Sequence, residues 1–414
     1  MEDELLLLNP GPVPVHPQVR AAMDAPMISR RSDEFAELYD RVRDGLSYVF
    51  TRSTPDGSRT ATGGTPLVLN GTATMGMEAA VANLVRPDDE VVALVNGQFS
   101  DRFAWIAEKY ATVHRIDADW GRSFDVGAVE DVIDDARLVV MVHNETSTGL
   151  SNPVEEVGAI VAEHDALFAV DGVSSIGGEE FRIDDWGVDV AITDPQKALA
   201  SPPGISALYL SETAIDELNA SGRDASGRGE NDRDASDRDE NDQRIGARTP
   251  AYQDLRAYLT AAETGATPYT AASPQFRALA VALELIEDEG MPDRIDRHRR
   301  WADAVRSGVR SMGLEPFAKP TGGSSYTNTL TAVALPDGVR GDADRFFDGL
   351  AERNVSVGGG LGHLDGELFR MSNMGHLSPE QLCYALRAVG ESLGDAGADV
   401  DVDAGVETLE ERLS

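Results

Sequence analysis

The sequence predicts an α/β protein built on a largely parallel β-sheet, followed by a smaller α+β segment. The first observation is a regular alternation of short β-rich runs and amphipathic runs between residues 65 and 210. The second is that apolar residues of the amphipathic runs recur at helical spacing, as Met75, Met77, Val81 and Leu84 do. Because strands that alternate with helices are joined by right-handed crossovers, this order favours a parallel sheet covered on both faces.

Each predicted strand of this region is a short apolar run, and each predicted helix has one apolar face. The predicted strands are 66–70, 90–95, 112–116, 137–143, 166–170, 188–193 and 205–210. The predicted helices are 74–85, 101–110, 125–135 and 153–165. Ligands of such sheets bind beyond the carboxyl ends of the strands, so residues that follow each strand are the first candidates for chemistry.

The sequence after residue 270 predicts a second, smaller α+β domain. Its helices are expected at 273–289, 292–312, 342–353 and 379–393, and its strands at 329–335, 355–358 and 367–372. We therefore expect an N-terminal segment (1–30), a large domain (31–270), a small C-terminal domain (271–394) and an acidic tail (395–414). The tail has few apolar residues before Leu409, so we expect it to be frayed.

Residues 221–247 form a low-complexity insertion in the predicted large domain. Arg223, Arg228, Arg233 and Arg238 mark a loose five-residue period, and no large apolar residue occurs from 221 to 244. A segment that buries no apolar surface cannot offset the entropy lost on ordering. We expect a mobile, disordered surface loop there.

The charge balance excludes several classes of partner. The chain has 72 acidic and 36 basic residues, a formal net charge of −36 and a pI near 4.4. Such a chain has little charge with which to bind nucleic acid or an anionic membrane surface. Its 41% hydrophobic content is ample for a packed core. Excess acid with almost no lysine indicates a protein adapted to concentrated salt, which screens self-repulsion.

The remaining composition favours a cytoplasmic protein without a metal site. The single cysteine, Cys383, excludes an intramolecular disulfide framework, and its predicted helix suggests that it is buried. The start of the chain lacks the basic residues of a signal peptide, and no apolar run is long enough to span a membrane. Seven histidines show no metal-binding spacing, so we expect no metal site.

The first candidate site element is Asn70-Gly71-Thr72-Ala73-Thr74, where a strand ends and a helix begins. Backbone N–H groups at a helix start, together with the helix dipole, bind phosphate well. Thr72 and Thr74 add hydroxyl donors. A helix capped by threonine in the ordinary way explains the same residues, and the two readings stay open on this stretch alone.

The second and third elements are a carboxylate and a lysine, each at the end of a predicted strand. Asp171 follows the apolar run 166–170; a carboxylate buried there needs a cation, although it would also suit a helix N-cap. Lys197 lies in a loop flanked by prolines, and the chain keeps only two other lysines, Lys109 and Lys319. Arginine replaces lysine as a surface charge but cannot form a Schiff base under ordinary conditions.

A phosphate cradle, a strand-end carboxylate and a constrained lysine together predict a pyridoxal 5′-phosphate site. At these residues the chain resembles the class V, fold type I aminotransferases, in the group of serine–pyruvate and alanine–glyoxylate aminotransferases. The most specific matches are Gln196-Lys197-Ala198-Leu199 with Pro202-Pro203-Gly204, and Phe369-Arg370-Met371-Ser372 after a glycine-rich turn. The resemblance runs from Pro10-Gly11-Pro12 to about Leu393. It implies a large domain with a mostly parallel seven-stranded sheet.

The resemblance also implies a role for each matching residue. Lys197 would be the Schiff-base lysine and the proton shuttle, with its pKa lowered, and Asp171 would pair with the pyridinium nitrogen. Arg370 and Gly11 would bind the substrate, Arg370 through its α-carboxylate. The remaining cofactor-binding residues would be Gly71, Thr72, Ala73, Thr74 and Gln196 at the phosphate, and Phe99, Thr146 and Val173 around the ring.

Tyr269 and Thr270 match positions that reach the phosphate of the second subunit in this family, which implies a homodimer. The expected reaction moves an amino group from alanine or serine to glyoxylate or pyruvate by a ping-pong mechanism. Alternatives are an aspartate or aminophosphonate transaminase, a cysteine-desulfurase type of activity, which Cys383 makes less favoured, and a non-catalytic protein that binds pyridoxal phosphate.

Overall fold

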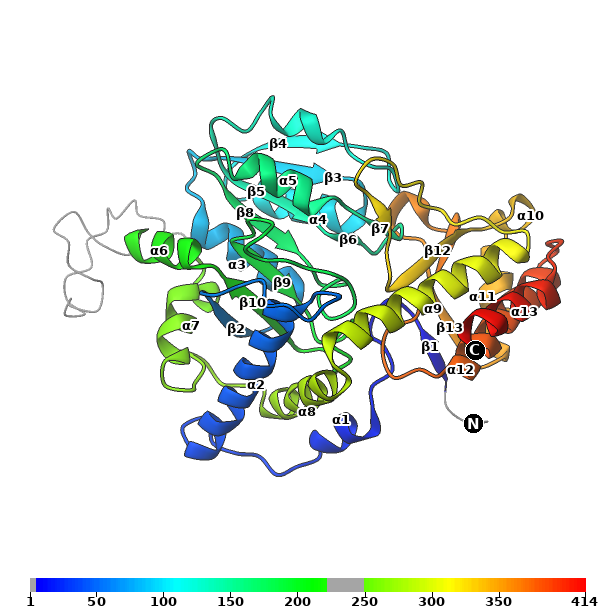
Figure 1. The fold of residues 1–414 in the computed structure, drawn as a ribbon, viewed down its shortest axis with the longest axis horizontal. Coiled ribbons are helices and arrows are strands. Elements are labelled where there is room, and N and C mark those ends of the chain that lie inside the picture. The colour runs from blue at the N-terminus through cyan, green and yellow to red at the C-terminus, as the bar shows by residue number, and fades with distance from the viewer. Residues whose placement is uncertain (1–4, 222–248) are drawn as a thin grey trace.

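The computed structural model describes residues 5–221 and 249–414, and its centre is a seven-stranded sheet (Figure 1). The predicted insertion, 221–247, lies outside the described residues except for Ser221. The sheet order is β2-β10-β9-β8-β5-β3-β4. The strands are β2 (Thr65–Asn70), β3 (Glu90–Val95), β4 (Thr112–Asp117), β5 (Ala136–Val142), β8 (Leu167–Asp171), β9 (Val190–Thr193) and β10 (Ile205–Leu210). The predicted seven-stranded, mostly parallel sheet is confirmed.

Only β10 interrupts the parallel arrangement of this sheet, because it pairs antiparallel with both β2 and β9. The pairs β3·β4, β3·β5, β5·β8 and β8·β9 are all parallel. The carboxyl ends of β5, β8 and β9 therefore meet at one edge of the sheet. Almost every residue of the central strands is buried, as expected for a sheet covered on both faces.

Helices pack against this sheet and complete the larger hydrophobic cluster. Helix α3 (Ala73–Leu84) contacts β9 and β10, α4 (Gln98–Ala107) contacts β3 and β5, and α5 (Val154–Val161) contacts β8. Helix α2 (Asp33–Arg52) packs against β2 and against α8 (Ser273–Glu289). The remaining helices here are α1 (Pro17–Ala22), α6 (Glu212–Ser221) and α7 (Leu255–Ala262).

A second sheet forms the smaller lobe, with the order β1-β13-β14-β12. Its strands are β1 (Leu6–Leu8), β12 (Leu330–Ala334), β13 (Val355–Gly359) and β14 (Leu368–Ser372). Around it lie α9 (Met291–Ser311), α10 (Asp337–Arg340), α11 (Ala343–Glu352), α12 (Pro379–Asp395) and α13 (Val402–Leu413), seen beside the larger sheet in Figure 1. The strand nearest the N-terminus thus belongs to the same sheet as strands near the C-terminus.

A short three-stranded sheet, in the order β11-β7-β6, joins the two lobes. It consists of β6 (Asn144–Glu145), β7 (Leu150–Ser151) and β11 (Ser325–Tyr326). The buried carboxylate of Glu179 strengthens this junction, because it accepts hydrogen bonds from Asn144 Nδ2 at 2.6 Å and from the hydroxyl of Thr327. The short sheet therefore places the segment that follows β5 beside β11, which comes just before β12 of the smaller lobe.

Three local expectations were wrong. The predicted helix at 125–135 is only a 3₁₀ turn, Val126–Val129, because the acidic residues after it would oppose the negative end of a helix dipole. Cys383 is partly exposed, because it lies at the edge of the smaller hydrophobic cluster. The tail is not frayed, because helix α13 buries Val406 and Leu409 against α9 and α12.

The helix α8 packs with the larger lobe, since Phe276, Leu279 and Leu283 belong to its hydrophobic cluster. Among the described residues, no helix combines the length and apolarity needed to cross a membrane.

We expect Leu409→Ala to lower the free energy of unfolding by about 2–5 kcal/mol, because it leaves a cavity where a fully buried side chain packs. The matched control is Leu413→Ala, which removes a partly exposed side chain of the same helix and should cost much less. Urea unfolding at constant salt measures both. Equal, small losses would mean that α13 does not pack against the lobe in solution.

Candidate active site

Lys197 lies in the loop that follows β9, and its side chain is only 8% exposed. The loop turns sharply after it: Ala200 N–H donates to the Lys197 carbonyl at 2.9 Å, and Ala200 adopts a left-handed φ of 54°. Gly11 covers the lysine from the N-terminal segment. A Cβ added to Gly11 would approach Lys197 Cδ and Cε to 2.9 Å, so a larger residue would displace the lysine side chain, and the φ of +119° at Gly11 also favours glycine.

Asp171 is the last residue of β8 and is 4% exposed. Its Oδ1 accepts a hydrogen bond from Val173 N–H at 2.8 Å. Burial raises the pKa of Asp171 to about 7, although this hydrogen bond and Lys197 oppose the rise. Burial and the charge of Arg370 lower the pKa of Lys197 to about 8, although Asp171, Asp194 and Glu145 oppose this. The pair therefore titrates near neutrality, which is a property common at functional sites.

The stretch after β2 has the geometry of an anion cradle. Gly71 has a φ of +148°, a conformation that favours glycine, and Thr72 is the N-cap of α3 but its side chain caps nothing. Capping of the helix by its hydroxyl therefore does not explain why threonine occupies position 72. Among the described residues, the N–H groups of Thr72 and Thr74 donate no hydrogen bond. The Ala73 N–H is already engaged by Asp194 Oδ2 at 2.7 Å.

Asp194 was not assigned a role from the sequence, although it directly follows β9, much as Asp171 ends β8. It is fully buried, and burial raises its pKa to about 6. It ties the start of α3 to the lysine loop, where Gln196 is a close neighbour. The strand-end position is the signal that could have identified it.

Phe99 lies in the first turn of α4, which follows β3, and Thr146 lies in the turn that follows β6. The Phe99 ring centroid lies 5.4 Å from Lys197 Nζ and 5.2 Å from Arg102 Cζ. Thr146 Oγ1 lies 2.5 Å from Ser174 Oγ, next to Val173. The Phe99 ring therefore lies beside the lysine, and the contact with Ser174 brings Thr146 close to Val173.

Arg370 lies in β14 of the smaller lobe, and its side chain reaches the larger lobe. Two backbone carbonyls hold its guanidinium. Its Nε donates to Gly359 O at 2.8 Å, and its Nη1 donates to Thr146 O at 3.2 Å. Burial lowers its pKa to about 10, while Glu145 opposes this. At that value the guanidinium still carries its charge near neutral pH, so it can bind a carboxylate.

Tyr269 and Thr270 are not gathered with these residues in the single chain. The Tyr269 ring stacks on Tyr252 with a centroid distance of 4.7 Å, and its hydroxyl donates to the Ala251 carbonyl. Thr270 is exposed, and its carbonyl accepts a hydrogen bond from Asn70 Nδ2 at 2.6 Å. Both therefore lie at the surface, next to the start of the anion cradle.

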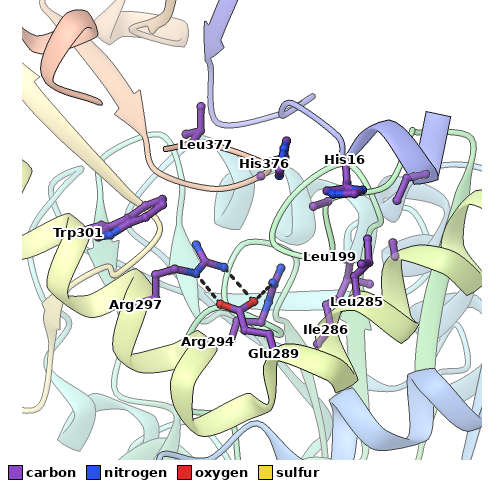
Figure 2. A pocket seen from close by; sticks show the side chains of 14 residues that line it. His16, Leu199, Leu285, Ile286, Glu289, Arg294, Arg297, Trp301, His376 and Leu377 are labelled. Carbon is purple, nitrogen blue, oxygen red and sulfur yellow. Dashed lines mark hydrogen bonds and ion pairs between the residues drawn. The ribbon is translucent and has the colours of Figure 1, made fainter. Parts of the chain in front are cut away.

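A separate cavity of about 330 Å³ lies behind the lysine loop and contains none of the predicted site residues (Figure 2). Its wall includes Arg294, whose Nε donates to Gly177 O at 2.7 Å and whose Nη2 donates to the Ala198 carbonyl. Figure 2 shows Glu289 between Arg294 and Arg297, with ion pairs to both. Arg294, the buried member of this cluster, thus holds Ala198, the residue next to Lys197.

Comparisons with known proteins agree with this geometry. A family model described as aminotransferase class V matches residues 31–263. An uncharacterized aminotransferase of Methanocaldococcus jannaschii is 34% identical over 415 residues, which cover 99% of this chain and 97% of that protein. The chain belongs to the class V aminotransferase family.

Other members of the family carry more specific names. Serine–glyoxylate aminotransferase of Arabidopsis thaliana is 30% identical, with 97% of this chain and 93% of that protein covered. The crystal structure of ureidoglycine–glyoxylate aminotransferase from Bacillus subtilis has a TM-score of 0.84 at 27% identity, with 100% of this chain and 98% of that chain covered. This class V chain is therefore a fold type I, pyridoxal-phosphate-dependent aminotransferase.

The residues present fit that cofactor. Two N–H groups of the cradle have no partner in the described chain, the carboxylate of Asp171 has its pKa raised by burial, and an aromatic ring lies beside the lysine. A phosphate, a protonated ring nitrogen and a planar ring satisfy these three groups respectively.

We expect Asp171→Asn to change how the stability of the cofactor-free protein depends on pH. The folded state keeps a proton on Asp171 up to about pH 7, whereas an ordinary aspartate loses it near 3.8. Between these values the folded state binds more protons, so this carboxyl's contribution to the free energy of unfolding falls as pH rises. The free energy of unfolding of the wild type minus that of the variant should therefore fall by up to about 4 kcal/mol as pH rises, at about 1.4 kcal/mol per pKa unit.

Urea unfolding at constant salt, between about pH 4 and pH 7, measures this difference. The control is Asp88→Asn, which alters an exposed carboxyl. A difference for Asp171 as flat as that for Asp88 contradicts the raised pKa.

Proposed function

We propose that this aminotransferase transfers an amino group from alanine or serine to glyoxylate or pyruvate. The observation that carries the proposal is the buried guanidinium of Arg370, held by two carbonyls close to Lys197. A fixed guanidinium beside the reacting amine suits an α-amino acid, whose carboxylate and amino nitrogen are joined through one carbon. The serine–glyoxylate aminotransferase relative supports the choice of substrates.

The residues that hold the cofactor are, in this proposal, those gathered at the carboxyl ends of the strands. Gly71, Thr72, Ala73, Thr74 and Gln196 bind the phosphate. Ala73 contributes by its position in the helix start, because its N–H already donates to Asp194. Asp171 pairs with the ring nitrogen, Phe99 and Val173 cover the two faces of the ring, and Thr146 lies beside the ring's oxygen substituent.

When bound, pyridoxal phosphate supplies an electron-accepting ring that lets an amino group and an α-proton be exchanged. Lys197 provides the amine that carries the cofactor and moves the proton. With a pKa of about 8, its amine is neutral in a useful fraction of molecules near neutral pH. Arg370 orients the substrate by its carboxylate, and Gly11 leaves the space that the lysine needs.

The proposal extends to assembly and environment. Tyr269 and Thr270 lie at the surface beside Asn70, where they are available to the phosphate site of a second subunit in a homodimer. The net charge of −36 and the three lysines suit a haloarchaeal cytoplasm. The single cysteine fits the reducing conditions there.

Arg370→Ala should keep the visible absorbance band of the bound cofactor but slow its conversion by alanine or serine. The loss should be roughly tenfold to a hundredfold, because a hydrogen bond to a charged group is worth about 1.5–3 kcal/mol. Single-turnover absorbance with a panel of amino acids measures the rate and identifies the donor. Arg345→Ala, at an exposed position, is the control. Unchanged conversion in Arg370→Ala would refute the carboxylate assignment.

Lys197→Ala should lack the band that borohydride removes from the wild-type protein, because alanine has no amine to form the covalent link. Absorbance after dialysis against pyridoxal phosphate measures this. The control is Lys319→Ala, since that lysine is half exposed and pairs with Glu315. A borohydride-sensitive band that persists in Lys197→Ala would place the link on another residue.

We expect the thermal midpoint and the activity to rise with potassium chloride concentration, because salt screens the repulsion among 72 acidic side chains. Thermal unfolding and the alanine half-reaction, each measured across a salt series, test this. Stability and activity that do not respond to salt would argue against a halophilic protein.

A further inference from the structure

The carboxylate of Glu145 is completely buried and lies among five hydrogen-bond donors from two segments. On one side are Phe99 N–H at 3.3 Å, Ser100 N–H at 3.0 Å and the Ser100 hydroxyl at 2.9 Å. On the other are Ser147 N–H at 3.1 Å and the Ser147 hydroxyl at 2.5 Å. The Ser100 hydroxyl also lies 3.1 Å from the Gly97 carbonyl, so it can donate its hydrogen bond either to that carbonyl or to the Glu145 carboxylate.

These donors belong to the two walls of the active site. Phe99 and Ser100 are in the first turn of α4, whose N–H groups would otherwise lack partners, and the positive end of the helix dipole attracts the carboxylate. Ser147 is next to Thr146, whose carbonyl holds Nη1 of Arg370 at 3.2 Å. One side chain thus connects the wall that carries the Phe99 ring with the wall that holds the guanidinium.

The chain makes room for this carboxylate at a specific point. Gly97 is the N-cap of α4, with extended backbone and no side chain. A Cβ at this position would lie 2.2 Å from Glu145 Cγ and 2.6 Å from Ser147 Oγ, closer than real Cβ contacts occur. The glycine therefore allows Glu145 to reach beneath the helix start.

We propose that Glu145 is a positioning residue of this aminotransferase, which fixes the Phe99 ring and the Arg370 guanidinium relative to each other. This inference rests on the roles proposed above for Phe99 and Arg370. The negative charge of Glu145 also acts on the groups around it, since it favours the charged forms of Lys197 and Arg370 and the neutral form of Asp171. Asp194 is the other carboxylate that faces Lys197 and Asp171, and it remains in every variant below.

The test is Glu145→Gln in the holoenzyme. Glutamine has nearly the same shape, but its NH₂ group must face donors, and the charge is lost. We expect the dissociation constant for pyridoxal phosphate to rise at least tenfold, which corresponds to about 1.4 kcal/mol. We also expect a weaker visible circular-dichroism band, which reports ring orientation, and a higher KM for alanine.

The matched control is Glu179→Gln, which alters another buried carboxylate with a comparable set of donors. Glu179 accepts from Asn144 Nδ2 at 2.6 Å, from Ser151 Oγ at 3.2 Å and from the Thr327 hydroxyl, but it contacts neither Phe99 nor Ser147. Both variants should lose thermal stability, whereas only Glu145→Gln should change the dichroism band and the KM. Identical dichroism and KM in the two variants would overturn the proposal.

A second variant tests the same proposal if Glu145→Gln does not fold. The double substitution Ser100→Ala with Ser147→Ala removes the two hydroxyls and keeps the carboxylate and the backbone donors. It should change the dichroism band and the KM in the same direction, by severalfold. Unchanged values in a folded double variant would equally overturn the proposal.

If Phe99 does not have the role proposed above, the dichroism bands of the variants give a different pattern. Phe99→Leu should itself reduce the dichroism band if the ring stacks on the cofactor. A normal band in Phe99→Leu refutes the role of Phe99. A reduced band there, with a normal band in Glu145→Gln, refutes only the role of Glu145.

Discussion

The burial of one lysine amine is the constraint on which the rest of this site depends. An ammonium taken out of water is costly, and here it is placed near three buried carboxylates, Asp171, Asp194 and Glu145, and one guanidinium. The carboxylates lower the cost of charge on Lys197, whereas burial and Arg370 raise it. The resulting pKa of about 8 lets the amine gain and lose a proton under ordinary conditions. The three carboxylates and the guanidinium are each in turn held by backbone atoms.

The sequence was sufficient for the parts of the site that follow strands. Asp171 and Lys197 could be found because each directly follows or closely trails a short apolar run, and a parallel sheet brings such ends together. Arg370 and Phe99 came only with the resemblance to a family, since nothing local distinguishes one arginine among 33 or one phenylalanine among 12. The order and partners of the seven strands needed the structure, in particular the antiparallel placement of β10.

Other parts could not be predicted because their partners are distant in the chain. Glu145 stands within a stretch that the sequence already singles out, but its donors Phe99 and Ser100 lie about 45 residues away. The acidic tail has few apolar residues, so its composition does not predict packing. Val406 and Leu409 nevertheless fall on one face of α13 and pack against a surface made by α9 and α12. In the proposed homodimer, Tyr269 and Thr270 act on a second copy of the chain, and the single chain leaves Tyr269 half-buried and Thr270 exposed.

The pairing of β1 with β13 has a consequence for the order in which the protein is made. Leu6 pairs with Val355, so the first strand must wait for about 350 further residues before its partner exists. Gly11, which lies over Lys197, follows this strand by only a few residues. All seven strands of the larger sheet are therefore made before β1 has a partner in its own sheet. The strand that precedes Gly11 can pair only after Val355 has been made, so this part of the protein, translated early, is among the last to take its place in a sheet.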